Sequence, residues 1–159
     1  WLKVDLGKAS GEYHYSKIRP RVIAEAFLPV EKETDVVDFK IHCFNGQPKF
    51  IGVCYDRDPI THASKGLIYS PQWERMLILQ GDDPACSYPK PERLEDMLEM
   101  AKKLSADFPY VRVDLYAIQD LVFFGELTFS PDGNIPEREY TKEACALIGN
   151  WLDLSEIKL

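Results

Sequence analysis

The stretch VRVDLYAIQDLVFFGELT, residues 111–128, decides the fold, because it predicts two strands folded back on each other. Apolar and polar residues alternate over 111–116, which is typical of a half-buried strand. Gln119 and Asp120 predict a turn, and a second strand is expected over 121–129. We therefore expect an antiparallel hairpin with one charged face.

The charged face of this hairpin brings two carboxylates together. With the turn at this position, Asp114 lies opposite Gly125 or Glu126, and Arg112 lies near Thr128. Opposed like charges are destabilising unless something neutralises them. Mg²⁺ is one candidate, since it takes carboxylate oxygens at about 2 Å and usually fills other positions with phosphate. The alternative is a solvated face whose carboxylates pair with Arg112 or with a lysine, and the pattern leaves both open.

Length and composition restrict the class of protein. The 159 residues suit one domain with a real core, so we expect a single domain over 1–159. A charged fraction of 28% beside 45% hydrophobic residues argues against extensive disorder. The net charge of −7 argues against a sequence-independent nucleic-acid binder, although it permits a nucleotide bound through a metal.

The chain carries no signal for a membrane or for a metal-binding cysteine cluster. No apolar run approaches the roughly 20 residues of a membrane span, and no signal peptide is recognisable, so we expect a cytoplasmic protein. The cysteines are too widely spaced for a zinc site, and free thiols are the default expectation, with disulfides left open. They are Cys43, Cys54, Cys86 and Cys145.

Further strands are predicted on both sides of a charged loop. RVIAEAFL, residues 21–28, reads as a strand, and Asn-Gly at 45–46 predicts a hairpin between strands 36–44 and 48–55. Short strands are expected over 67–69 and 76–79. The stretch 55–66, between the strand that ends at residue 55 and the strand 67–69, is rich in charge and turn formers and reads as a loop.

Two helices complete the prediction. The first begins at Pro91 and has a buried stripe at helical spacing, with acidic residues in its first turn. The second covers 141–152, with Thr141 as its N-cap. The order of elements predicts an α+β fold with a mainly antiparallel sheet and helices packed on one face. Trp1, which has no capping residue before it, suggests a fragment.

Several segments together resemble a known family. RVDLY followed by GELTFSPDG is similar to the metal-binding hairpin of the ATP-grasp superfamily, and VIAEAFL is similar to its hinge strand. DFKIHCFNGQPKF, a DR loop and a PKPERL helix follow the order of the TupA-like ATP-grasp family, which is named for teichuronopeptide synthesis. This resemblance covers most of the chain and implies the C-terminal portion of an ATP-grasp fold.

The resemblance implies roles for particular residues. Asp114 and Glu126, with Thr128 where many relatives have Asn, would hold Mg²⁺ between nucleotide phosphates. Arg112, Lys40 and Arg57 would act on the phosphate or substrate as catalytic residues. The adenine would be read by the segment Glu25, Ala26, Phe27 and Leu28, and the ribose by Asp38.

The implied activity is that of an ATP- and Mg²⁺-dependent ligase, which activates a carboxylate as an acyl phosphate for attack by an amine. A pathway of cell-surface polysaccharide or glycopeptide biosynthesis is implied, with a small carboxylate or sugar as acceptor. The N-terminal lobe, its lysine-bearing strand and its glycine-rich loop are not recognisable in the sequence. The alternatives are a non-catalytic nucleotide-binding or partner-binding module, and a plain structural α+β domain.

Overall fold

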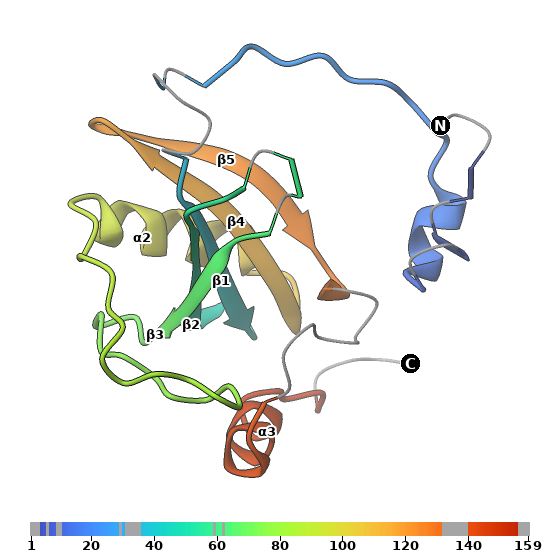
Figure 1. The fold of residues 1–159 in the computed structure, drawn as a ribbon. Helices are drawn as coiled ribbons and strands as arrows, with labels where there is room; N and C mark the ends of the chain where they lie inside the picture. The colour runs from blue at the N-terminus through green and yellow to red at the C-terminus, as the bar shows by residue number, and fades with distance from the viewer. Residues whose placement is uncertain are drawn as a thin grey trace.

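A five-stranded antiparallel sheet forms the centre of the computed structural model, which describes residues 4–5, 7–8, 11–28, 30, 36–58, 60–61, 63–131 and 140–155 (Figure 1). The strand order is β3-β2-β1-β4-β5. The strands are β1 (Asp38–Phe44), β2 (Gln47–Tyr55), β3 (Lys65–Tyr69), β4 (Tyr110–Ile118) and β5 (Leu121–Thr128). This confirms the predicted α+β class and antiparallel sheet.

Both predicted hairpins are present. Asn45 and Gly46 join β1 to β2 with φ angles of 47° and 72°, as a tight turn of this kind requires. Gln119 takes a positive φ of 54° in the turn between β4 and β5. β1 also pairs antiparallel with β4, so the two hairpins form one continuous surface.

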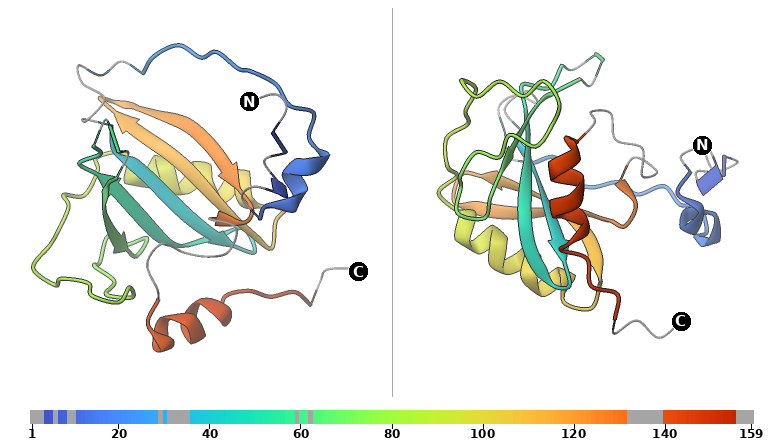
Figure 2. Two further views of the ribbon diagram at one scale, coloured as in Figure 1. Left: turned by 45° about the vertical axis from the view of Figure 1, so that its right-hand side comes forward. Right: turned by 90° about the horizontal axis from the view of Figure 1, so that it is seen from below.

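The helix α2 (Leu94–Ser105) covers one face of the sheet (Figure 2). Its buried residues Leu94, Met97 and Ala101 pack on apolar side chains that alternate along the central strands. These strand residues are Phe39, Ile41, Cys43, Ile51, Val53, Val111, Val113 and Leu115. The apolar residues that recur at helical spacing in α2 and those that alternate along the strands thus form one core, as the sequence predicted.

The second helix, α3 (Lys142–Gly149), lies on the opposite face, which differs from the prediction that both helices share a face. Figure 2 shows α3 on the side of the sheet away from α2, and Ala144 packs with Phe44, Phe50 and Ile68 in a cluster separate from the one that α2 covers. Thr141 caps the helix by accepting a hydrogen bond from the backbone N–H of Ala144. The apolar stripe could not reveal the face, because a large apolar patch exists on both sides of the sheet.

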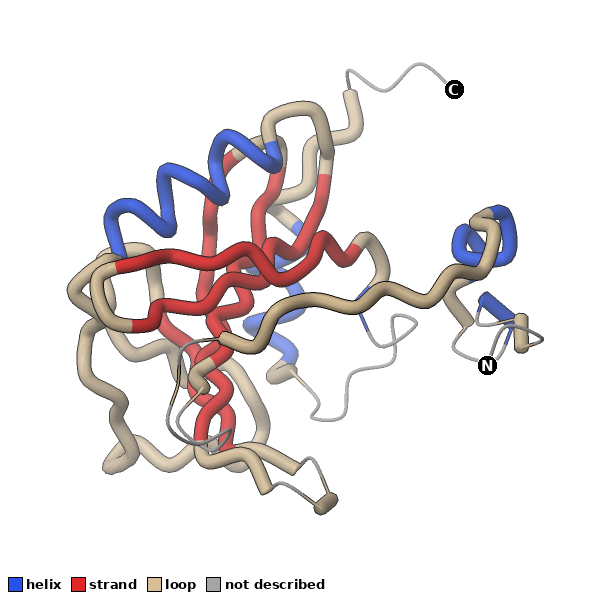
Figure 3. The backbone as a smooth tube through the Cα atoms, turned by 90° about the horizontal axis from the view of Figure 1, so that it is seen from above, coloured by secondary structure: helices blue, strands red, loops and turns tan. Residues whose placement is uncertain are grey.

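Two predicted strands are wrong. Residues 21–28 have no strand structure; they form part of an extended arm leading back to the 3₁₀ helix η1 (Tyr13–Lys17) (Figure 3). Residues 76–79 make only an isolated bridge from Leu79 to Tyr140. Apolar, β-branched composition favours a strand only where a neighbouring strand is available to pair with it, and these segments lack one among the described residues.

Three further observations concern the cysteines, the helices and the residues that the structure does not describe. All four cysteines are free thiols, with Cys43 buried in the core. No helix in the described ranges is long and apolar enough to cross a membrane. Trp1, and the end of the GELTFSPDG segment beyond residue 131, lie outside the described residues.

Candidate functional site

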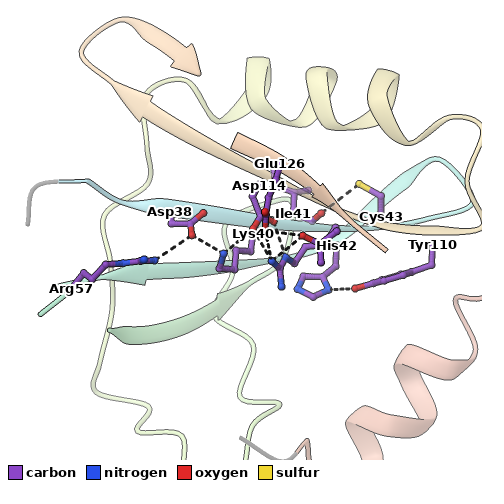
Figure 4. Close-up of polar contacts among 11 residues, drawn as sticks. Asp38, Lys40, Ile41, His42, Cys43, Arg57, Tyr110, Asp114 and Glu126 are labelled. Carbon is purple, nitrogen blue, oxygen red and sulfur yellow. Dashed lines mark hydrogen bonds and ion pairs between the residues drawn. The ribbon is translucent and has the colours of Figure 1, made fainter. Parts of the chain in front are cut away.

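The sheet face opposite α2 brings together seven of the predicted site residues. They come from the two hairpins and the loop after β2, although they are spread over more than half of the sequence. β1 supplies two of them, β4 two, β5 two and the loop one (Figure 4). They are Asp38, Lys40, Arg57, Arg112, Asp114, Glu126 and Thr128.

Asp114 is the centre of this cluster. Its side chain is only 2% exposed, and both of its oxygens accept hydrogen bonds from cations. Arg112 donates from Nε to Oδ1 at 2.7 Å and from Nη2 to Oδ2 at 2.8 Å, and Lys40 Nζ donates to Oδ2 at 2.8 Å. A buried carboxylate stays charged only with such partners, so Arg112 and Lys40 are required by the burial of Asp114.

Glu126 lies directly opposite Asp114 in the β4–β5 pairing, which is one of the two registers that the sequence left open. Its side chain is 60% exposed and accepts from Arg112 Nη2 at 3.2 Å. The Thr128 hydroxyl accepts from the same guanidinium at 3.1 Å and donates to Glu126 at 2.9 Å. Arg112 therefore joins all three oxygen-bearing side chains that were predicted to hold a metal.

Asp38 extends the cluster along β1. Lys40 Nζ lies 2.6 Å from its Oδ2, and the Arg57 guanidinium lies 3.5 Å from the same oxygen. Burial raises the pKa of Asp38, and the charge of Lys40 only partly offsets this effect. Burial alone would lower the pKa of Lys40, but the Asp114 and Asp38 carboxylates outweigh it and the pKa is raised. Lys40 is thus held as a cation between two carboxylates.

A β-bulge at Gly125 sets the register of this site. Leu115 pairs with Phe124, whereas Asp114 pairs with Glu126, so Gly125 is the extra residue on β5. Regular pairing would instead have placed Gly125 opposite Asp114 and turned Glu126 to the α2 face. The sequence left these two registers open, and the bulge is the reason that Glu126 joins the site.

The bulge leaves little room for a side chain, which gives a testable prediction. A Cβ added at Gly125 would lie 3.0 Å from the Asp114 carbonyl oxygen and 3.0 Å from the Tyr116 ring. We expect Gly125→Ala to lower the free energy of unfolding by about 1–3 kcal/mol, measured by urea denaturation. Gly66→Ala, a strand position where a Cβ meets nothing within 4 Å among the described residues, is the control. Equal stability of both variants and the wild type would refute a tight bulge.

Sequence reasoning missed a second polar pair on the same face. His42 pairs with Arg112 across β1 and β4, and its Nδ1 lies 2.9 Å from the Tyr110 hydroxyl. The His42 ring also stacks on Phe50 with centroids 4.1 Å apart. Burial, with the nearby charges of Arg112 and Lys40, lowers the pKa of His42 to about 3, so this ring is neutral at physiological pH. The signal was present, because His42 shares the strand face of Asp38 and Lys40.

The predicted adenine segment is not brought to this face. Glu25, Ala26 and Phe27 are exposed on the extended arm, and Leu28 is partly buried at its end (Figure 3). Their role in nucleotide binding stays a prediction. The 3₁₀ helix at the start of the arm does approach the site. Ser130 Oγ donates a hydrogen bond to the Glu12 side chain at 3.4 Å. Burial, with the charges of Glu12 and Glu126, raises the pKa of Tyr15, and the charge of Arg112 opposes this effect.

The donor set suits a hard cation that brings other ligands with it. Asp114, Glu126 and Thr128 offer only oxygens, the ligands that Mg²⁺ prefers. Within the described ranges, no three His, Cys, Asp or Glu side chains group closely enough to form a metal cage. Mg²⁺ is usually held by one or two carboxylates together with substrate phosphates, so a pair of carboxylates fits this ion. Asp38 Oδ1 is buried and has no hydrogen-bond partner among the described residues, so this face can accept a hydrogen bond from a bound ligand.

Comparison with known proteins identifies the family. The family model described as TupA-like ATPgrasp matches residues 2–153, which is most of the chain. No curated protein and no solved structure matched significantly. The match agrees with the sheet, the paired carboxylates of the β4–β5 hairpin and the cations beside them, and it identifies an ATP-grasp-type, ligase-like domain. The chain belongs to the TupA-like ATP-grasp family.

Proposed function

We propose that this chain acts in an ATP- and Mg²⁺-dependent ligation that joins a carboxylate to an amine. The observation that carries the proposal is the pairing of Asp114 with Glu126 across the hairpin, with Arg112 and Lys40 beside them. Two carboxylates for the metal and two cations for phosphate charge are what phosphoryl transfer needs, because the protein acts there mainly through position and electrostatics.

In the proposed reaction a carboxylate oxygen attacks the γ-phosphorus of ATP. An O–P bond forms, the bond from the γ-phosphorus to its bridging oxygen breaks, and ADP leaves with that electron pair. An amine then attacks the acyl carbon, inorganic phosphate leaves, and the amine releases a proton to solvent. Bound Mg²⁺ would neutralise phosphate charge and align the phosphates.

The residues have separate proposed roles in this reaction. Asp114 and Glu126, with the Thr128 hydroxyl, would hold the metal. Arg112 and Lys40 are charged at physiological pH and would stabilise the transferring phosphoryl group. Arg57 is half-exposed at the rim and would attract the anionic substrate. Asp38, with one unpartnered oxygen, would accept a hydrogen bond from a ribose hydroxyl.

The finer part of the proposal is a cytoplasmic step in cell-surface polysaccharide or glycopeptide biosynthesis. It is supported only by the family, whose name refers to teichuronopeptide synthesis. The second candidate is a nucleotide-binding module without catalysis. It is favoured by the ion pairs that already occupy both oxygens of Asp114, since these satisfy the carboxylate in the absence of a metal.

Metal removal tests the proposal. We expect ATP to bind in a calorimetric titration with Mg²⁺ and to bind at least tenfold more weakly with EDTA. Incubation with ATP, Mg²⁺, a carboxylic acid and hydroxylamine then separates the two candidates, because an acyl phosphate is trapped as a hydroxamate. Metal-dependent binding without hydroxamate for any acid favours the binding module. Equal binding with and without Mg²⁺ would contradict the ligase proposal and would favour a binding module that needs no metal.

A further inference from the structure

A cleft of about 990 Å³ lies on the same sheet face, beside the metal hairpin rather than over it. Its floor is formed by β1, β2 and β3, and α3 and the loop after β2 form its walls. Lys40 and Arg112 line its inner edge, while Asp114, Glu126 and Thr128 do not line it. The two cations therefore separate the proposed metal site from a second space large enough for an organic molecule.

The floor of the cleft contains two glycines in strand interiors. Gly52 pairs with Ile68 and Gly66 pairs with Cys54, so both face the cleft on neighbouring strands. A Cβ at Gly52 would only reach ordinary contacts, at 3.5 Å from Lys40 and 3.8 Å from Ile68. A Cβ at Gly66 would meet nothing within 4 Å among the described residues. Packing thus requires neither glycine, and a glycine in a strand often marks the place where a ligand approaches the backbone.

The charge of the lining points to an anion. The charged side chains that line the cleft are Lys40, Arg57 and Arg112, and no described carboxylate lines it. His42, beside Arg112, is neutral and adds a polar ring held by Tyr110. Lys40 and Arg112 lie towards the β4–β5 hairpin, so an anionic group beside them would point to the place where the phosphates are proposed to lie.

The remaining lining favours a molecule with a ring. Phe50, Ile68, Leu79 and Ile148 form apolar walls beyond the cations, and Thr61 and Ser64 add hydroxyls from the loop. The floor has no side chains at Gly52 and Gly66, and there the face of a ring can lie against the sheet. Ring-bearing acids of two kinds share this chemistry, namely sugar acids and alicyclic acids.

We propose that this cleft binds the acid that the ligation activates, a ring-bearing organic carboxylate whose body covers Gly52 and Gly66. The carboxylate lies at Lys40 and Arg112, and Arg57 attracts it at the rim. This assignment as acceptor site rests on the proposed function. The existence of a carboxylate site in the cleft does not, and it can be tested without nucleotide.

The test uses three probes without ATP or Mg²⁺, followed by backbone amide NMR shifts. The probes are D-glucuronate, cyclohexanecarboxylate and the uncharged cyclohexanecarboxamide. We expect saturable shifts at Gly52, Gly66 and Ile68 with at least one of the two acids, and which acid binds tighter distinguishes a sugar acid from an alicyclic one. Equal binding of the carboxamide, absence of binding by both acids, or shifts confined to other parts of the sheet would overturn the proposal.

Substitutions at the two floor glycines test the same proposal, because a large side chain there would fill the cleft. Gly52→Leu and, independently, Gly66→Leu should weaken acid binding at least tenfold, whereas Gly52→Ala, which adds only a tolerated Cβ, should retain most of it. Unchanged acid binding in both leucine variants would overturn the proposal. Thermal melts of all three variants show whether each is folded, and Gly66→Leu is the less crowded of the two positions.

A titration of the same proteins with Mg²⁺·ATP separates this inference from the proposed function. We expect Gly66→Leu, which does not adjoin Lys40, to bind Mg²⁺·ATP like the wild type. If it loses the nucleotide and keeps the acid, the nucleotide occupies the cleft and the acceptor assignment is wrong, while the proposed function stands. If the wild type binds the acid but no Mg²⁺·ATP, the proposed function fails and the carboxylate site stands.

Discussion

Asp114→Ala should lower the free energy of unfolding by roughly 3–5 kcal/mol, which is the usual effect of breaking a buried ion pair. The carboxylate is almost fully buried and accepts three hydrogen bonds from Arg112 and Lys40. Its removal leaves Arg112 in a buried position with only Glu126 and Thr128 as partners. Urea denaturation followed by circular dichroism measures the loss.

A second substitution checks the cause of this loss. Arg112→Met in the Asp114→Ala background removes the stranded cation and keeps a similar volume, so it should restore part of the stability. Lys40 still has Asp38 at 2.6 Å in this background and needs no replacement. A loss below about 1 kcal/mol for Asp114→Ala would mean that the ion pairs of Asp114 contribute little to stability.

Glu126→Gln should separate metal binding from stability. Its side chain is 60% exposed and, among the described residues, makes one ion pair with Arg112 and one hydrogen bond with Thr128, so we expect the free energy of unfolding to change by less than about 1 kcal/mol. Mg²⁺-dependent ATP affinity should fall at least tenfold, because an amide is a poor ligand for Mg²⁺ in place of a carboxylate. Calorimetric titration with Mg²⁺·ATP measures this affinity.

The matched control for that variant is Glu99→Gln. Glu99 is 66% exposed and is paired with Lys103 at 2.7 Å on α2, on the other side of the sheet. It loses the same charge and a comparable ion pair, so it should bind Mg²⁺·ATP like the wild type. Equal losses in both variants would indicate an effect of net charge and would remove Glu126 from the metal site.

Local signals predicted much of this fold correctly. Asn45 and Gly46 form the expected turn because their positive φ angles are a property of the residues themselves. The helix after Pro91 was predicted from apolar residues that recur at helical spacing, and the strand after Val111 from the alternation of apolar and polar residues. In each case the deciding interactions lie within a few residues in the sequence.

The errors concern features that depend on distant parts of the chain. Residues 21–28 have the composition of a strand but no strand beside them in the described structure. The face on which α3 packs depends on Phe44, Phe50 and Ile68, which lie far away in the sequence.

The candidate site shows the same division. The turn position placed Asp114 opposite Gly125 or Glu126, and only the bulge decides between these two registers. The pairing of Asp38 with Lys40 was implied by their shared strand face. The contact between His42 and Tyr110 requires the β1–β4 pairing, which joins segments 68 residues apart. The cleft over Gly52 and Gly66 likewise depends on β3 and α3, so no motif could reveal it.

In the proposed function, Asp114 and Glu126 together hold a metal with the phosphates of ATP. Paramagnetic broadening by Mn²⁺·ATP in amide NMR spectra tests it most directly, because signals nearest the ion disappear first. The account predicts that the amides of residues 112–114 and 126–128 are lost at the lowest Mn²⁺ concentration and that those of α2 persist. Broadening centred on another acidic region, such as Asp82 and Asp83, with intact signals from the β4–β5 hairpin, would contradict it.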